Sequence, residues 1–90
     1  MSEQSASPRL TINWSLEARA NLRAIDREAA LEILHCIGRY LATRNGDVKK
    51  LKPPMTGFRL RCGDYRAFFK QMGENNISVT GVLHRSQAYR

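Results

Sequence analysis

The chain has 90 residues, 42% of them hydrophobic, and a formal net charge of +7 at pH 7. This length suits one domain with one modest core, and the absence of any apolar run of about 18 residues excludes a transmembrane helix. The N-terminus has no basic stretch followed by an apolar one, so we expect no secretion signal but a disordered lead over residues 1–8, a domain over residues 9–90 and a cytoplasmic protein.

The positive charge is concentrated in the second half of the chain. Up to Gly46, six Lys or Arg stand against five Asp or Glu, whereas from Asp47 onward nine stand against three. Such asymmetry indicates nucleic acid or an acidic protein as a partner. The cysteines and histidines show no metal-ligand spacing, so we expect no metal and no cofactor, and we interpret Cys36 and Cys62 as reduced core residues.

The first half of the chain is predicted to form a strand and two helices. Leu10, Ile12 and Trp14 alternate with polar residues, which is typical of a strand with one apolar face. Ser15 and Asp26 are each suited to cap a helix, so we divide the region near residues 25–26. Apolar residues recur at helical spacing in both segments, and Asn45-Gly46 is a stop signal for the second helix.

Residues 47–57 are predicted to be a loop. Pro53-Pro54 marks the loop, and Lys49, Lys50 and Lys52 give it a strong positive charge. Lysines in loops are commonly just solvated. Because this loop leads directly into a basic strand, contact with a phosphate backbone is the alternative reading.

Residues 58–70 are predicted to form a β-hairpin. Apolar and basic residues alternate from Phe58, and Gly63-Asp64 suits a two-residue hairpin turn, because glycine adopts the backbone conformation that such turns need. Closing the hairpin between Cys62 and Tyr65 fixes the register. The predicted pairs are Arg61 with Arg66, Leu60 with Ala67, Arg59 with Phe68, and Phe58 with Phe69.

This register gives the hairpin one apolar and one basic face. The basic face holds Arg59, Arg61, Arg66, Phe68 and Lys70, with no carboxylate on either strand. Like charges opposite each other destabilise a sheet by about 0.2–1 kcal/mol, so stability does not explain Arg61 opposite Arg66. Planar guanidinium groups suit phosphate, and we therefore interpret this face as a site for an anionic partner.

The last strand is predicted over residues 77–84, after a turn at residues 73–76. We place Ile77, Val79, Gly81 and Leu83 on the core face, and Ser78, Thr80, Val82 and His84 on the basic face, with Arg85 at its lip and Tyr89 beyond. A shift of one residue would exchange the two faces, so this arrangement requires a connection of three or five residues.

The predicted architecture is an α+β fold with the order β-α-α-β-β-β. A two-helix hairpin packs on one face of a mostly antiparallel, twisted sheet. The other face is left open, and the arginines line it.

Several short motifs in the second half occur in a characteristic order. They are Lys50-Leu51-Lys52, Gly57-Phe58-Arg59-Leu60-Arg61, Gly63-Asp64-Tyr65-Arg66, and Val82-Leu83-His84-Arg85 followed by Ala88-Tyr89-Arg90. Together they resemble the RelE/ParE superfamily of bacterial toxin–antitoxin toxins, in particular its RelE-like branch. The resemblance covers nearly the whole chain and is sharpest over residues 50–90. It implies a RelE-like fold and an endoribonuclease that cuts messenger RNA in the ribosomal A site.

By motif position, the resemblance implies a catalytic set of Arg59, Arg61, Arg66, Arg85 and Tyr89. Attack of a ribose 2′-hydroxyl on the adjacent phosphate needs positioning and charge stabilisation, which guanidinium groups supply. Some relatives have a lysine or glutamate where this chain has Arg59 and Arg61, and arginine does not deprotonate. His84 is the candidate for proton transfer, with Tyr89 as the alternative.

RNA binding is expected from residues around this set. They are Lys49, Lys50, Lys52, Phe68 and Lys70. The implied partners are the ribosome, messenger RNA and a cognate antitoxin with an acidic or amphipathic segment, and we expect oligomers only through the antitoxin complex. Two other functions stay open on the same fold, namely ParE-like inhibition of DNA gyrase and non-catalytic RNA binding.

Overall fold

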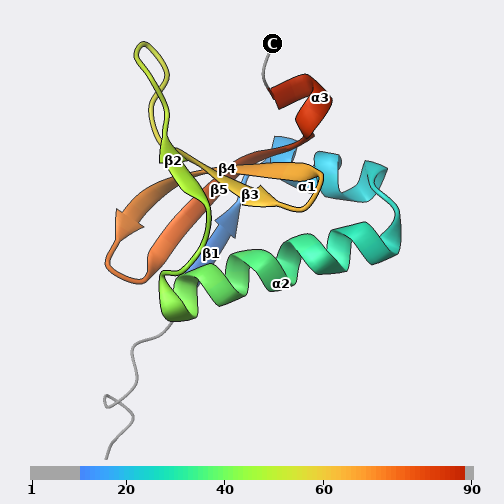
Figure 1. Ribbon diagram of the computed structural model, residues 1–90, viewed down its shortest axis with the longest axis horizontal. Coiled ribbons are helices and arrows are strands. Elements are labelled where there is room, and N and C mark those ends of the chain that lie inside the picture. The colour runs from blue at the N-terminus through green and yellow to red at the C-terminus, as the bar shows by residue number, and fades with distance from the viewer. Residues whose placement is uncertain (1–10, 89–90) are drawn as a thin grey trace, which may run out of the picture.

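The computed structural model describes residues 11–88, so the expected lead over residues 1–8 as well as Leu10 and Tyr89 lie outside the described residues. The elements follow the chain in the order β1 (Thr11–Trp14), α1 (Leu16–Ala24), α2 (Arg27–Thr43), β2 (Val48–Lys50), β3 (Phe58–Cys62), β4 (Tyr65–Gly73), β5 (Asn76–His84) and α3 (Arg85–Ala88). This is the predicted α+β fold, extended by one short strand and one short helix (Figure 1).

The strands form one sheet in the order β1-β5-β4-β3-β2. β1 runs parallel to β5, and the other neighbouring strands are antiparallel, so the sheet is mostly antiparallel as predicted. β2 lies within residues 47–57, for which the sequence predicts only a loop. Its three residues pair with Leu60, Arg59 and Phe58, and they are too few and too polar to show a strand pattern of their own.

The two long helices begin where the sequence predicts. Ser15 Oγ accepts a hydrogen bond from Ala18 N–H at 3.0 Å and caps α1, and Asp26 occupies the cap position of α2. α2 ends at Thr43, because Arg44 adopts a left-handed conformation with φ of 60° and its N–H bonds back to the Tyr40 carbonyl. No helix among residues 11–88 is long and apolar enough to cross a membrane.

The core lies between α2 and the inner face of the sheet. α2 packs against β3 and β4, and α1 packs mainly against β5. In Figure 1, α2 lies on one side of the sheet, whereas α3 and the segment between β2 and β3 rise on the other. The largest fully buried side chains are Ile33, Ile37, Leu60, Ile77 and Val79.

The predicted register of the hairpin is confirmed at every pair. Arg61 lies opposite Arg66, Arg59 opposite Phe68, and Cys62 opposite Tyr65. Gly63 has a φ of +63°, a conformation that glycine adopts without strain. The inner face is apolar as expected, because Leu60, Ala67 and Phe69 are each at most 2% exposed.

The predicted faces of β5 are correct only for its first half. Ile77 and Val79 are buried on the inner face, but Phe68 pairs with Gly81 while Phe69 pairs with Val79, which leaves Thr80 as a bulge. One extra residue exchanges the faces beyond it. Val82 is therefore buried at 2% exposure, and its predicted place on the basic face is wrong.

The connection between β4 and β5 also differs from the expected three or five residues. Gly73 pairs with Asn76, so only two residues, Glu74 and Asn75, join the strands. A second register shift lies between Gln71 and Gly73, where Met72 is the additional residue. That shift, and not the length of the connection, brings Ile77 to the inner face.

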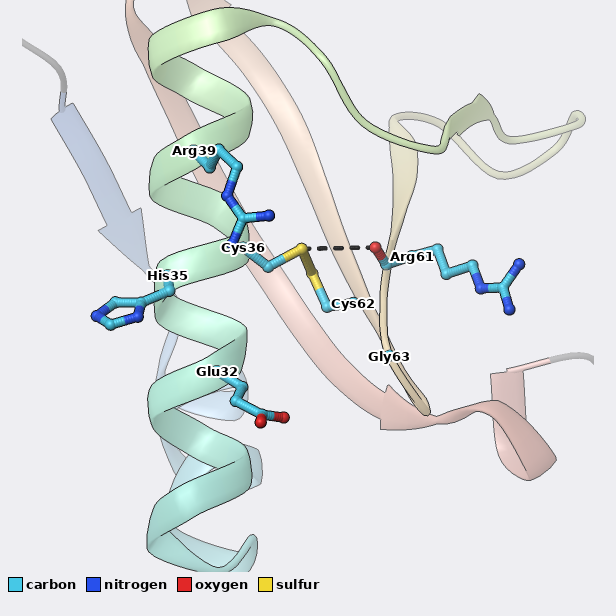
Figure 2. Close-up of a pocket in the computed structure, with 7 residues that line it drawn as sticks. All are labelled: Glu32, His35, Cys36, Arg39, Arg61, Cys62 and Gly63. Atoms are coloured by element: carbon cyan, nitrogen blue, oxygen red, sulfur yellow. Dashed lines mark hydrogen bonds between the residues drawn. A yellow bond between two sulfur atoms is a disulfide. The ribbon is translucent and has the colours of Figure 1, made fainter.

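The interpretation of the cysteines as reduced is wrong in this structure. Cys36 on α2 and Cys62 on β3 form a disulfide with a Cα–Cα distance of 5.9 Å (Figure 2). Cys62 belongs to the buried core and Cys36 packs against it. The bond therefore ties the long helix directly to a central strand of the sheet.

Candidate nucleic-acid interface

A row of basic and aromatic side chains crosses the middle of the outer face of the sheet. The pairing of the strands places Lys49 of β2 opposite Arg59 of β3, and Arg59 opposite Phe68 of β4. Both Arg59 and Phe68 are half-buried, whereas Lys49 is exposed. Three adjacent strands thus bring two cations and one ring to the same surface.

This row lines a pocket of about 470 Å³, which we call the cationic pocket. The segment after β2 forms one wall and α3 contributes to the other. The lining residues are Lys49, Lys50, Leu51, Lys52, Met55, Arg59, Phe68 and Ala88. Four of the five residues predicted for RNA binding are among them, and Arg59 of the predicted catalytic set joins them.

A second pocket, of about 360 Å³, adjoins the first and extends toward α1; we call it the α1 pocket. Leu51, Met55, Phe68 and Ala88 line both pockets. Beyond them the α1 pocket is bounded by Glu17 and Asn21 of α1, Thr56, and the bulged part of β5. The two pockets together form a groove whose ends differ in charge.

Arg61 points away from α2 and is held loosely (Figure 2). Its Nη1 lies 3.7 Å from Asp47 Oδ2, and both side chains are more than half exposed. Sequence reasoning found no carboxylate on this face of the hairpin, because Asp47 precedes β2, which was not predicted. An exposed pair of this kind contributes at most about 1 kcal/mol, so it leaves Arg61 available to an anion.

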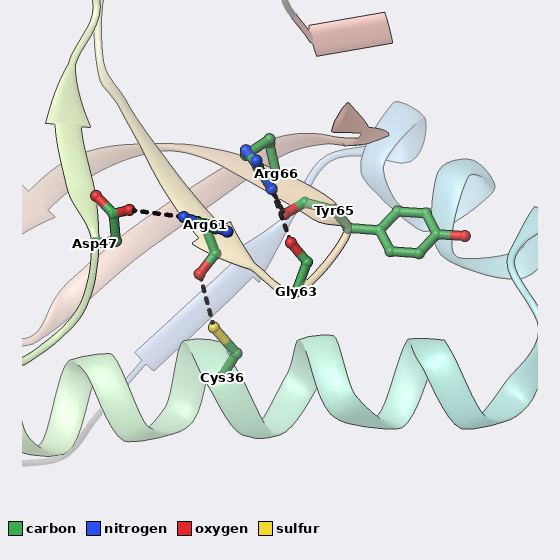
Figure 3. A network of polar contacts seen from close by, with 6 residues as sticks. All are labelled: Cys36, Asp47, Arg61, Gly63, Tyr65 and Arg66. Carbon is green, nitrogen blue, oxygen red and sulfur yellow. Dashed lines mark hydrogen bonds and ion pairs between the residues drawn. The ribbon is translucent and has the colours of Figure 1, made fainter. Parts of the chain in front are cut away.

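Arg66 is buried, unlike the other predicted arginines, and is 5% exposed. Its Nη1 donates hydrogen bonds to the carbonyl oxygens of Gly63 at 2.9 Å and Tyr65 at 3.0 Å (Figure 3). These bonds hold the turn of the β3–β4 hairpin. The expectation of an open surface residue is wrong for Arg66, whose guanidinium braces the backbone beneath the basic face.

His84 lies on the inner side of the sheet, so its predicted place on the basic face is wrong. It pairs with Tyr65, and their rings meet edge to face with centroids 5.3 Å apart. Ser86 N–H donates to His84 Nδ1 at 3.2 Å. The bulge at Thr80 is the cause, and this position removes His84 from proton transfer in the groove.

The remaining predicted residues fall in different places. Arg85 is exposed at the start of α3, and its backbone N–H donates to the Asp64 carbonyl at 2.8 Å, which brings it beside the hairpin turn. Lys70 is exposed on β4 and lines neither pocket. Tyr89 lies outside the described residues.

Within residues 11–88, no three His, Cys, Asp or Glu side chains gather to hold a metal.

A family comparison decides what kind of protein this is. The model of a family described as the ParE toxin of type II toxin–antitoxin systems, parDE, matches residues 12–89. The chain belongs to this ParE toxin family. It is the toxin of a type II toxin–antitoxin system, and the resemblance to the RelE/ParE superfamily is confirmed. No curated protein sequence matches the chain.

Solved structures of toxins share the fold of this ParE-family chain. The RelB–RelE antitoxin–toxin complex from Methanococcus jannaschii matches with a TM-score of 0.66 and 22% identity over 86% of this chain and 94% of that chain. The RelBE2 toxin–antitoxin complex from Mycobacterium tuberculosis gives 0.67 and 22% over 84% and 98%. The YoeB dimer from Staphylococcus aureus gives 0.68 and 20% over 86% and 98%. At these identities the likeness establishes the fold.

Sequence reasoning missed several groove residues of this toxin. Leu51 and Met55 come from the segment after β2, and Glu17 and Asn21 come from α1. A weak signal existed for this apolar pair, because Leu51 and Met55 are large hydrophobic residues in a segment otherwise rich in lysine and proline. No signal pointed to α1, because it reaches the groove only by packing beside β5.

The buried position of Arg66 leads to a test of its role. Replacing Arg66 by Ala leaves two carbonyl oxygens without their donor, and we expect the free energy of unfolding to fall by about 1.5–3 kcal/mol. Arg61→Ala is the matched control on the adjacent strand, since it breaks only an exposed ion pair and should change stability by less than about 1 kcal/mol. Urea unfolding measures both, and equal losses would contradict the bracing role.

Proposed function

We propose that this toxin is an endoribonuclease that cuts messenger RNA on the ribosome and so inhibits translation. The observation that supports the proposal most directly is the cationic pocket, which Lys49, Lys50, Lys52 and Arg59 line together with Phe68. Lysine and arginine bind phosphate, and single-stranded RNA is commonly held by bases that stack on aromatic rings. The pocket combines both kinds of contact in a space of about 470 Å³.

The reaction we propose uses the RNA's own nucleophile. The ribose 2′-hydroxyl attacks the adjacent phosphorus and gives its proton to water, a 2′–O–P bond forms, and the bond from phosphorus to the 5′-oxygen of the next nucleotide breaks. The departing 5′-oxygen takes up a proton. Negative charge grows on the phosphorane, and the guanidinium of Arg59 in the cationic pocket is suited to stabilise it, with the exposed Arg61 on the same face as a second cation. Arg85, exposed at the start of α3 beside the hairpin turn, would hold a neighbouring phosphate.

The proton steps fall to groups other than the arginines. Arginine keeps its proton, and His84 faces the inner side of the sheet, so neither serves as a base in the groove. Tyr89 follows Ala88, which lines both pockets, and we propose it for orienting the RNA or protonating the departing 5′-oxygen. We assign Arg66 to holding the hairpin under the site and not to contact with the phosphate.

The proposal implies a setting and partners. A messenger-cutting toxin works in the cytoplasm, with the ribosome presenting the RNA. The basic groove would be covered by a cognate antitoxin through an acidic or amphipathic segment, and oligomers would form only through that complex. The solved RelB–RelE and RelBE2 structures are toxin–antitoxin complexes, which supports a partner of this kind.

Inhibition of DNA gyrase is the second candidate function. The family model that matches the chain is that of ParE toxins, and the burial of Arg66 removes one arginine from the exposed face. A toxin that acts by binding gyrase would need the basic groove only as a contact surface. The fold is compatible with either activity.

One experiment separates the two functions. After induction of the toxin in cells, we expect primer extension to map new messenger 5′ ends in phase with codons, and no gyrase-linked DNA breaks. Intact messenger together with gyrase-linked breaks would replace the nuclease proposal by the second candidate. RNA binding without any cleavage on ribosomes would indicate a non-catalytic relative.

A further inference from the structure

The two pockets of the groove differ in chemistry and meet at Phe68. The cationic pocket offers only positive charge, whereas the α1 pocket is lined by Glu17, Asn21 and Thr80 among its polar residues. Glu17 is the only carboxylate among the described residues that line either pocket. A phosphate would be attracted to one end and repelled by the other, so the groove can hold a nucleotide in one direction only.

The hydrogen-bonding groups at the α1 end are already oriented by the fold. Asn21 Oδ1 accepts from Val82 N–H at 2.9 Å, which leaves the amide NH₂ of Asn21 as a donor. Thr80 Oγ1 donates to the Phe68 carbonyl at 3.2 Å, and its oxygen is then an acceptor. The Glu17 carboxylate is acceptor-only. Thr56 and Gln87 complete the polar lining of this pocket, and each can donate or accept. Glu17 is therefore the one side chain among the described residues lining the α1 pocket that can only accept.

We infer that the α1 pocket binds the base of the nucleotide whose phosphate lies at the lysines, and that Glu17 selects guanine. This inference rests on the proposed RNA-cleaving function. Guanine is the one common RNA base with two adjacent donors, N1–H and the N2 amino group, on its pairing edge, and these match the two oxygens of a carboxylate. Its O6 is an acceptor suited to the Asn21 amide.

The other bases fit this arrangement less well. Uracil has one donor between two acceptors, and adenine and cytosine each pair one amino donor with an acceptor nitrogen. Each of these would place an acceptor against the Glu17 carboxylate. All four bases can stack on Phe68, so the ring contributes affinity, whereas Glu17 contributes specificity for the base.

The test is cleavage on ribosomes programmed with short messengers. The A-site codon carries uridine only, or one guanosine or inosine at each position in turn; inosine is guanosine without the N2 amino group. At the preferred position we expect the guanosine codon to be cut about tenfold faster than the inosine codon, the scale of one hydrogen bond to a charged group. The ratio within one protein is the readout, so differences in overall activity cancel.

Two variants complete the test. Glu17→Gln replaces one acceptor oxygen by a donor and should bring the guanosine-to-inosine ratio near one. Glu28→Gln, at an exposed glutamate in the first turn of α2 that lines neither pocket, should keep the full ratio. Equal cleavage of guanosine and inosine codons by the parent, or an unchanged ratio in Glu17→Gln, overturns the inference and leaves the nuclease standing. No cleavage of any codon overturns the nuclease proposal itself.

Discussion

Replacing Arg59 by Ala is expected to slow messenger cleavage on ribosomes by about 100- to 1,000-fold, the loss typical of removing one group that stabilises a developing charge. Arg59 lies between Lys49 and Phe68 on the outer face and lines the cationic pocket. Its guanidinium is suited to contact two phosphate oxygens at once. Arg59→Lys keeps the charge and loses this geometry, so we expect it to recover only part of the rate.

The control for Arg59 is Lys70 on the neighbouring strand. Lys70 is exposed and lines neither pocket, so Lys70→Ala removes the same unit of charge without touching the groove. Single-turnover cleavage measures both variants, and urea unfolding checks that each is folded. An equal loss in the two variants would show that net charge, and not the position of Arg59, drives cleavage. Full activity in Arg59→Ala would remove the proposed site.

The sequence was sufficient to predict the hairpin down to individual pairs. A period of two residues assigns faces, and a turn that starts at Gly63 fixes which residues lie opposite each other. The same reasoning failed on β5, because a bulge inserts one unpaired residue and so exchanges the faces beyond it. The alternation of residue types along the strand does not reveal such an insertion. Gly81 inside a strand was the one available sign of irregularity, and Thr80 next to it is the bulged residue.

The sequence predicted which face of the sheet carries the candidate site, but not how deeply each side chain is buried. Alternation places Arg59, Arg61 and Arg66 on one side of the sheet, and the pairing agrees. Nothing in the alternation distinguishes the buried Arg66 from the exposed Arg61, because burial depends on what later segments cover. The walls of the groove come from α1, the segment after β2, and α3, which lie far apart in the sequence and meet only through the order of the strands.

The disulfide also depends on tertiary packing that the sequence does not show. Cys36 and Cys62 are 26 residues apart, and they meet because α2 lies across β3 with Cys36 turned toward the sheet (Figure 2). A helix pattern defines which residues share a stripe, but not how the stripe is aligned along the sheet. With only two cysteines and an expected cytoplasmic location, the sequence favoured a pair of reduced thiols.

Reduction of the disulfide is expected to lower the free energy of unfolding by about 3.5 kcal/mol at 25 °C. This value follows from closing a loop of 26 residues in the unfolded chain, in the chain-entropy description. For a domain of this size it corresponds to a fall in Tm of roughly 15–25 °C. Thermal unfolding followed by circular dichroism, with and without a dithiol reductant, measures the difference.

The double variant Cys36→Ala, Cys62→Ala provides the control for this experiment. It should unfold near the temperature of the reduced parent and show no further change with reductant. If the parent's Tm does not respond to reductant, the two cysteines do not form a stabilising bond in solution. Because disulfides are rare in a reducing cytoplasm, a large response would mean that the toxin in its proposed compartment is much less stable than the oxidised protein. In the reduced toxin, the attachment of α2 to β3, the strand that carries Arg59, would then depend on packing and on the antitoxin.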